Sequence, residues 1–253
     1  RALFPPPPPT TPRAAKRGNN RLSKVLISGL HIGTDPSTCD STGQLGNTQF
    51  SSPVGIASAA NGDIVVADTG NRRVAKYNSA GQALVRWGLS GGPDGFLGNT
   101  NGVAIAPDGT IAVADETQLR RFTANGALIN SVNTTGTPQD LAISSTGEIY
   151  RLTQSGVTRY NPATLAVNGT FGSSGSGNGQ LSIASGLGID STDAIYVADY
   201  GNNRVQKFSS TGTYQSQFPS TRVRDVAFSP GDQRLYTVNI TTVVSPASVT
   251  VDN

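Results

Sequence analysis

The residue types that most often carry enzyme chemistry are scarce in this chain of 253 residues. It holds one histidine (His31), one cysteine (Cys39) and two glutamates (Glu116 and Glu148). A catalytic zinc ion needs several ligands from such side chains, and an internal disulfide needs two cysteines. The sequence therefore excludes a histidine-rich zinc lyase site and an internal disulfide. We expect Cys39 to be an inert thiol, with pairing between chains as the alternative.

Aspartates are more numerous, and some of them recur in one pattern. Asp68, Asp115 and Asp199 each end a short apolar stretch, and Arg73 and Arg204 each follow five residues after an aspartate. Because a catalytic site is usually asymmetric, a motif that returns along the chain is typical of a structural role. We predict that these carboxylates accept backbone N–H bonds in the turn and that neighbouring Asn and Gly residues adopt positive φ. A ring of charge on one face is the alternative.

No other catalytic signature is present. The chain lacks a phosphate-binding glycine loop with its lysine and lacks a nucleophile elbow. A calcium site of a hydrolase, built from Asp, Asn and Glu oxygens, is the alternative. The sequence shows no recognisable cluster of such residues. We expect no metal and no cofactor.

The basic character of the chain is confined to its beginning. The net charge is +3, but the first 24 residues carry six Lys or Arg and no acid, so the rest sums to −3. Binding to nucleic acid needs a concentrated basic surface. Nucleic-acid binding is therefore the weakest of the functions considered. No apolar run approaches the roughly 18 residues of a membrane-spanning helix, so we predict no span.

An internal repeat organises most of the sequence. Five segments superpose with almost no gaps, and each has an alternating strand, a turn rich in Ser, Gly and Asp, and a second strand. These segments are 55–68, 103–115, 141–153, 187–199 and 226–239. The second strands start at Ile64, Ile111, Ile149, Ile195 and Leu235.

Two further strands follow most of the hairpins. The third strands are predicted at 73–77, 119–122, 157–160, 205–208 and 248–251, and the fourth at 83–87, 127–132, 166–171 and 213–218. Four strands in a unit that recurs every 38 to 47 residues is the spacing of propeller blades. We predict an all-β protein, a β-propeller of four-stranded antiparallel blades, with five blades favoured and six as the alternative.

The fifth unit stops before a fourth strand, while the segment 24–32 (KVLISGLHI) has no unit of its own. We predict that this N-terminal strand completes the last blade and closes the ring. Its removal would leave an edge strand exposed to pairing with other chains.

Two stretches carry a family resemblance. Residues 52–81 (SPVGIASAANGDIVVADTGNRRVAKYNSAG) and 185–212 (SGLGIDSTDAIYVADYGNNRVQKFSSTG), with the connection 171–181 (FGSSGSGNGQL), resemble NHL repeats. The other units match in outline, and the third has Thr153 in place of the aspartate. The resemblance implies a propeller, often with six blades, in a family and its relatives that include both binding modules and enzymes.

The N-terminal arm, residues 1–23, precedes the propeller of residues 24–253. Five consecutive prolines force an extended polyproline segment without backbone donors. Methionine is absent and residue 1 is arginine, so we expect a piece of a longer chain. The arm is predicted either to be a linker or to dock on a protein partner or another copy. The docking residues would be Leu3, Phe4, Pro5, Pro6, Pro7, Pro8, Pro9, Arg13, Lys16 and Arg17.

These observations favour a non-catalytic propeller that mediates protein interaction or assembly. A Ser, Thr, Asn and Gly-rich composition with few lysines is typical of an extracellular, cell-surface or particle setting. A propeller hydrolase or lyase with a metal in its central channel is the alternative.

Overall fold

The computed structural model describes residues 50–88, 100–228, 234–239 and 248–252. The first sheet comprises β1 (Gly55–Ser58), β2 (Ile64–Asp68), β3 (Arg73–Tyr77) and β4 (Ala83–Trp87). The second comprises β5 (Gly102–Ile105), β6 (Ile111–Ala114), β7 (Gln118–Phe122) and β8 (Leu128–Asn133). The third comprises β9 (Asp140–Ile143), β10 (Ile149–Leu152), β11 (Val157–Tyr160) and β12 (Val167–Phe171).

The fourth sheet comprises β13 (Ala184–Ile189), β14 (Ile195–Asp199), β15 (Arg204–Phe208) and β16 (Tyr214–Pro219). The fifth has three strands among the described residues, β17 (Val223–Phe228), β18 (Leu235–Asn239) and β19 (Ser248–Asp252). Helix in the described part is limited to two 3-10 turns, η1 (Thr69–Asn71) and η2 (Tyr200–Asn202). None of the helices described there is long and apolar enough to cross a membrane.

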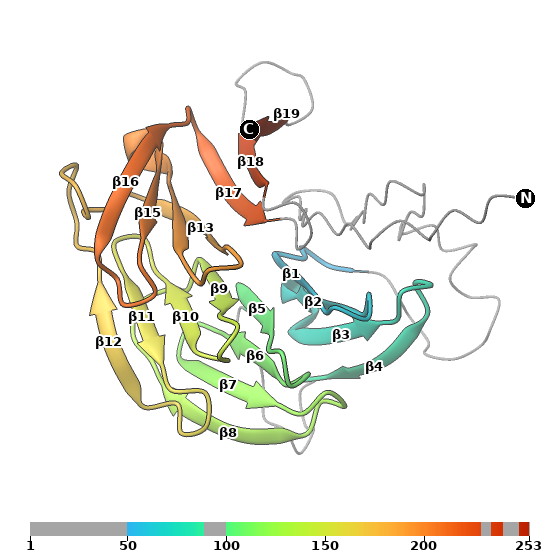
Figure 1. The fold of residues 1–253 in the computed structure, drawn as a ribbon. Coiled ribbons are helices and arrows are strands. Elements are labelled where there is room, and N and C mark those ends of the chain that lie inside the picture. Colours follow the sequence, from blue (N-terminus) through green and yellow to red (C-terminus); the bar gives the residue numbers. More distant parts are fainter. Residues whose placement is uncertain (1–49, 89–99, 229–233, 240–247, 253) are drawn as a thin grey trace, which may run out of the picture.

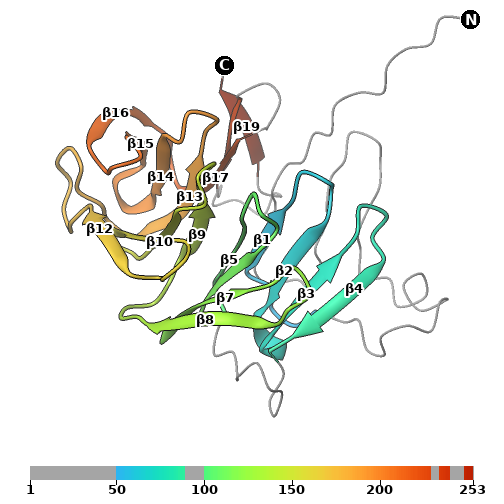
Figure 2. The same ribbon diagram turned by 60° about the horizontal axis from the view of Figure 1, so that its bottom comes forward.

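The sheets are arranged as blades of a propeller. Within each sheet, successive strands pair antiparallel in chain order, and the first strands β1, β5, β9, β13 and β17 contact one another in sequence. Figures 1 and 2 show the five sheets following one another around a common centre, with β4, β8, β12 and β16 outermost. The predicted all-β propeller with four-stranded antiparallel blades is confirmed at this level. The predicted closing strand 24–32 lies outside the described residues.

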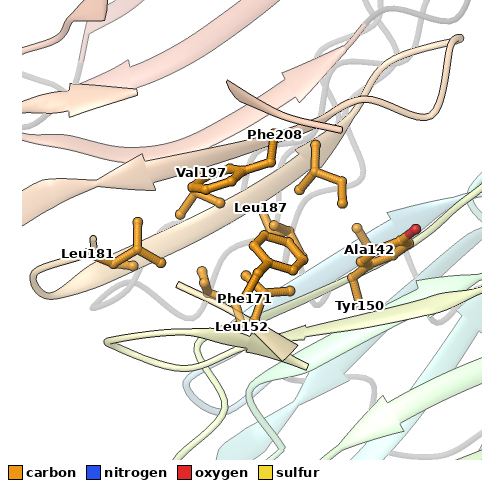
Figure 3. Close-up of a cluster of buried hydrophobic side chains, with 11 residues drawn as sticks. Ala142, Tyr150, Leu152, Phe171, Leu181, Leu187, Val197 and Phe208 are labelled. Carbon is orange, nitrogen blue, oxygen red and sulfur yellow. The ribbon is translucent and has the colours of Figure 1, made fainter. Parts of the chain in front are cut away.

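The core lies between neighbouring sheets because both faces of each inner strand are covered. In β10 all four residues, IYRL, are buried. Between the third and fourth sheets, Tyr150, Leu152 and Phe171 pack against Leu187 and other residues of β13–β15 (Figure 3). Covering two faces explains why the second strands are nearly continuous apolar runs.

An aromatic residue at the end of an outer strand packs against a glycine of the next sheet. A Cβ added to Gly126 would lie 2.8 Å from the Trp87 ring, and one added to Gly212 would lie 2.4 Å from the Phe171 ring. Both glycines also have positive φ, 85° and 93°. Each aromatic ring therefore needs a turn without a side chain beside it.

We predict that Gly212→Ala destabilises the protein more than Gly109→Ala. Gly109 has a φ of 81° with nothing within 4 Å of an added Cβ, so it measures the backbone cost alone, about 1 kcal/mol. The clash with Phe171 adds roughly 1–3 kcal/mol at Gly212. Urea unfolding of both variants gives the difference. Equal free energies of unfolding would contradict the role of Gly212 in packing.

Candidate functional site

One face of the propeller collects the recurring polar residues. Strands alternate in direction, so the turn after the second strand and the connection that leaves the fourth strand emerge at the same end of each sheet. The turn is also bonded to the segment that enters the first strand at this end, because Gly70 N–H donates to Ser51 O at 2.7 Å and Gly201 N–H donates to Ser182 O at 2.8 Å. We name this end of the molecule the turn face.

Asp68 binds three different segments of the first sheet. Its Oδ1 accepts the Ser51 N–H at 2.7 Å, and its Oδ2 accepts Arg73 Nε at 2.6 Å and Asn71 Nδ2 at 2.8 Å. The carboxylate is fully buried. A buried charge with this many charge-assisted and backbone partners is a fixed part of the fold.

Asp199 repeats this arrangement in the fourth sheet. Its Oδ1 accepts the Ser182 N–H and its Oδ2 accepts Arg204 Nε, both at 2.7 Å. Arg204 Nη2 also donates to the carbonyl oxygens of Gly177 and Gln180, both at 2.8 Å. The ion pair therefore ties the connection between the third and fourth sheets to β14 and β15.

The predicted bonding of these aspartates is partly wrong. Asp115 accepts backbone N–H groups of its own turn, from Thr117 and Gln118 at 2.8 Å each, and it also pairs with Arg120. The turns after Asp68 and Asp199 donate instead through the side-chain amides of Asn71 and Asn202, both at 2.8 Å. At Asp68 and Asp199 the backbone donor comes instead from the chain that enters the sheet. The incoming serine is held there by its own carbonyl bond to the turn glycine, which places its N–H against the carboxylate.

The predicted origin of positive φ is confirmed at Asn203 in the fourth sheet, but it is wrong in the first sheet, where an arginine takes this conformation, and for the glycines of both turns. The left-handed residues are Arg72 and Asn203, with φ of 52° and 53°. Gly70 and Gly201 are needed for space, because an added Cβ would lie 2.7 Å from Ser51 O and 2.6 Å from Ser182 O.

In the third sheet a different residue binds the connection that enters the sheet. Thr153 replaces the aspartate, and Arg151, at 1% exposure, donates to the carbonyl oxygens of Thr135 and Gly136 in the incoming connection. Burial lowers the pKa of Arg151 below its usual value. Sequence reasoning missed this residue. The available signal was an arginine where the aligned strands have Val66, Val113 and Val197.

A carboxylate on an inner strand is also hydrogen-bonded to backbone N–H groups. Asp140, on the inner strand β9, accepts N–H bonds from Leu141 at 2.8 Å and from Leu187 of the next sheet at 3.0 Å. Among the residues that the structure describes, no three His, Cys, Asp or Glu side chains are grouped so that they could hold a metal ion. His31, Cys39 and every predicted arm residue from Leu3 to Arg17 lie outside the described part.

Comparison with known proteins agrees with this architecture. The family model for the NHL repeat matches residues 50–77 and 181–208, the two segments with the Asp68 and Asp199 arrangements. The chain carries NHL repeats. No curated protein matches the sequence.

Solved structures extend the likeness to most of this NHL-repeat chain. A streptogramin B lyase structure has a TM-score of 0.65 and 13% identity, over 96% of this chain and 82% of that one. Catalytically inactive virginiamycin B lyase from Staphylococcus aureus with quinupristin also has a TM-score of 0.65 and 13% identity, over 95% and 83% of the chains. At this identity the likeness shows the fold alone.

We predict that Asp115 makes stability depend on pH in the acid range. Burial raises the pKa of Asp115, but bonds from Thr117, Arg120 and Gln118 outweigh this and lower it below 3.8. A lowered folded-state pKa gives stability above the unfolded pKa that is lost as pH falls through the folded value. The stability gap between the native chain and Asp115→Asn should therefore be largest near neutrality and shrink below about pH 4.

Urea titrations at several pH values measure this gap. The exposed neighbour Glu116 provides the control, because Glu116→Gln removes a charge from the same turn without removing a buried carboxylate. A gap for Asp115→Asn that stays constant down to pH 3 would contradict the assignment.

Proposed function

We propose that this NHL-repeat propeller is a non-catalytic binding or structural module that mediates protein interaction or assembly. The observation that carries the proposal is the use of the recurring polar residues. Asp68, Asp115 and Asp199 are each at most 1% exposed, and arginines and backbone N–H groups occupy their oxygen atoms. Side chains bonded in this way stabilise a rigid fold. The loops at its turn face are then available to recognise a partner.

The proposed setting is extracellular, on a cell surface, filament or particle, with the arm of residues 1–23 as a tether. The composition of the chain and the basic, proline-rich sequence of the arm support this part. An extended polyproline segment docks with little loss of conformational entropy, and its cations suit an acidic surface.

A propeller hydrolase or lyase with a metal in the central channel is the second candidate. It is favoured by the likeness of the fold to streptogramin B lyase. Metal analysis of the purified protein, with and without added Mg²⁺ or Ca²⁺, and a cleavage assay on quinupristin test it. A stoichiometric metal with turnover would replace the binding proposal.

Deleting residues 1–23 should abolish assembly without unfolding the propeller. The full chain is expected to associate or capture its partner, and the truncated chain to be monomeric with an unchanged unfolding midpoint. Sedimentation velocity and thermal unfolding measure the two properties. Unchanged assembly after the deletion would overturn the tethering role of the arm.

Deleting residues 1–32 should have a further effect if five blades close through the segment 24–32. The edge of β19 would then lose its neighbour, and an unpaired edge strand promotes association between chains. We expect a lower unfolding temperature and aggregation on heating, compared with the 1–23 deletion as the matched control. Equal stability of the two truncations would exclude closure by this strand.

A further inference from the structure

An arginine lies over a tyrosine ring where the fourth and fifth sheets meet on the turn face. The Arg224 guanidinium carbon is 3.8 Å from the centroid of the Tyr200 ring. Arg224 is exposed and Tyr200 half-buried. A guanidinium held over a ring face by a cation–π contact can still donate N–H groups to a carboxylate.

A second arginine and an isoleucine border the same turn. Arg222 N–H donates to Asn203 Oδ1 at 2.9 Å, and Ile183 follows Ser182, whose carbonyl oxygen binds Gly201. Neither Arg222 nor Arg224 forms an ion pair with a described residue. Arg222, Arg224 and Ile183 are therefore neighbours of the turn of residues 200–203, which itself carries Tyr200. We name Ile183, Tyr200, Arg222 and Arg224 the arginine patch.

The backbone at Ile183 makes its side chain an unusual choice. Ile183 has a φ of 50° and is 50% exposed, although a β-branched residue strongly disfavours the left-handed region. Ile183 lies three residues before Gly186, the partner of Ala198 in the second strand. The equivalent residues, Ser52 in the first sheet and Arg222 in the fifth, also have positive φ. The backbone shape is thus a property of the fold, and serine satisfies it. An exposed isoleucine there adds strain without adding burial, which is typical of a side chain kept for contact with a ligand.

We propose that the arginine patch binds an acidic peptide segment of a partner protein, with a carboxylate on Arg224 and Arg222 and an apolar neighbour on Ile183 and Tyr200. The inference rests on the proposed function and names the chemistry of one partner. A peptide fits better than nucleic acid, because tight binding to a phosphate backbone needs more cations than these two.

The test uses the full chain and a short fluorescein-labelled peptide of alternating Asp and Leu, titrated by fluorescence anisotropy. Arg224→Ala should weaken binding by about tenfold or more, since it removes a hydrogen bond between charged groups. Ile183→Ser should weaken binding several-fold while the protein stays folded, because Ser52 occupies the equivalent position. The matched control is Arg72→Asn. It removes an exposed arginine from the equivalent turn of the first sheet and installs the residue found at Asn203.

The expected pattern is loss of binding in Arg224→Ala and Ile183→Ser, with Arg72→Asn within twofold of the native chain. Equal weakening by Arg72→Asn, equal binding of an Asn and Leu peptide, or no binding by the native chain would overturn the proposal. Tighter binding of single-stranded RNA than of the peptide, lost in Arg224→Ala, would assign the patch to nucleic acid instead. The 1–23 deletion should keep peptide binding, so failure of the arm proposal and failure of the patch proposal are distinguishable.

Discussion

The buried ion pair between Asp and Arg at the end of the second strand holds each well-matched repeat together. In the fourth sheet, Asp199 and Arg204 join β14 and β15 and bind the chain that arrives from the third sheet. A buried carboxylate is costly unless it is fully hydrogen-bonded, so loss of any one partner leaves an uncompensated charge. The connection between the third and fourth sheets is therefore bonded to both β14 and β15.

Packing between sheets depends on this connection. Each sheet must present one face to the sheet before it and one to the sheet after it, and the connection sets the position of the next inner strand. The aromatic contacts of Trp87 with Gly126 and of Phe171 with Gly212 then join neighbouring sheets farther out. Hydrogen bonds and ion pairs at the turn face and apolar contacts between neighbouring sheets thus stabilise the same arrangement of the sheets.

The proposed binding role would use this rigidity of the turn face. The residue after the buried aspartate is Thr69 in the first sheet and Tyr200 in the fourth, so a constant frame displays different side chains. The third sheet keeps the frame by other means, because Arg151 replaces the carboxylate as the group that binds the connection. Side chains at such positions can vary without changing the fold.

The sequence by itself determined the repeat, the antiparallel strands of its units and the all-β class, because alternating side chains and turn residues act over a few neighbouring positions. It also singled out Asp68, Asp115 and Asp199. Only the tertiary structure decided that Asp68 and Asp199 bind a serine N–H 17 residues earlier, that Arg151 serves the third sheet, and that Arg224 lies on Tyr200. Those contacts join segments far apart in the chain, and their geometry depends on how one sheet sits against the next.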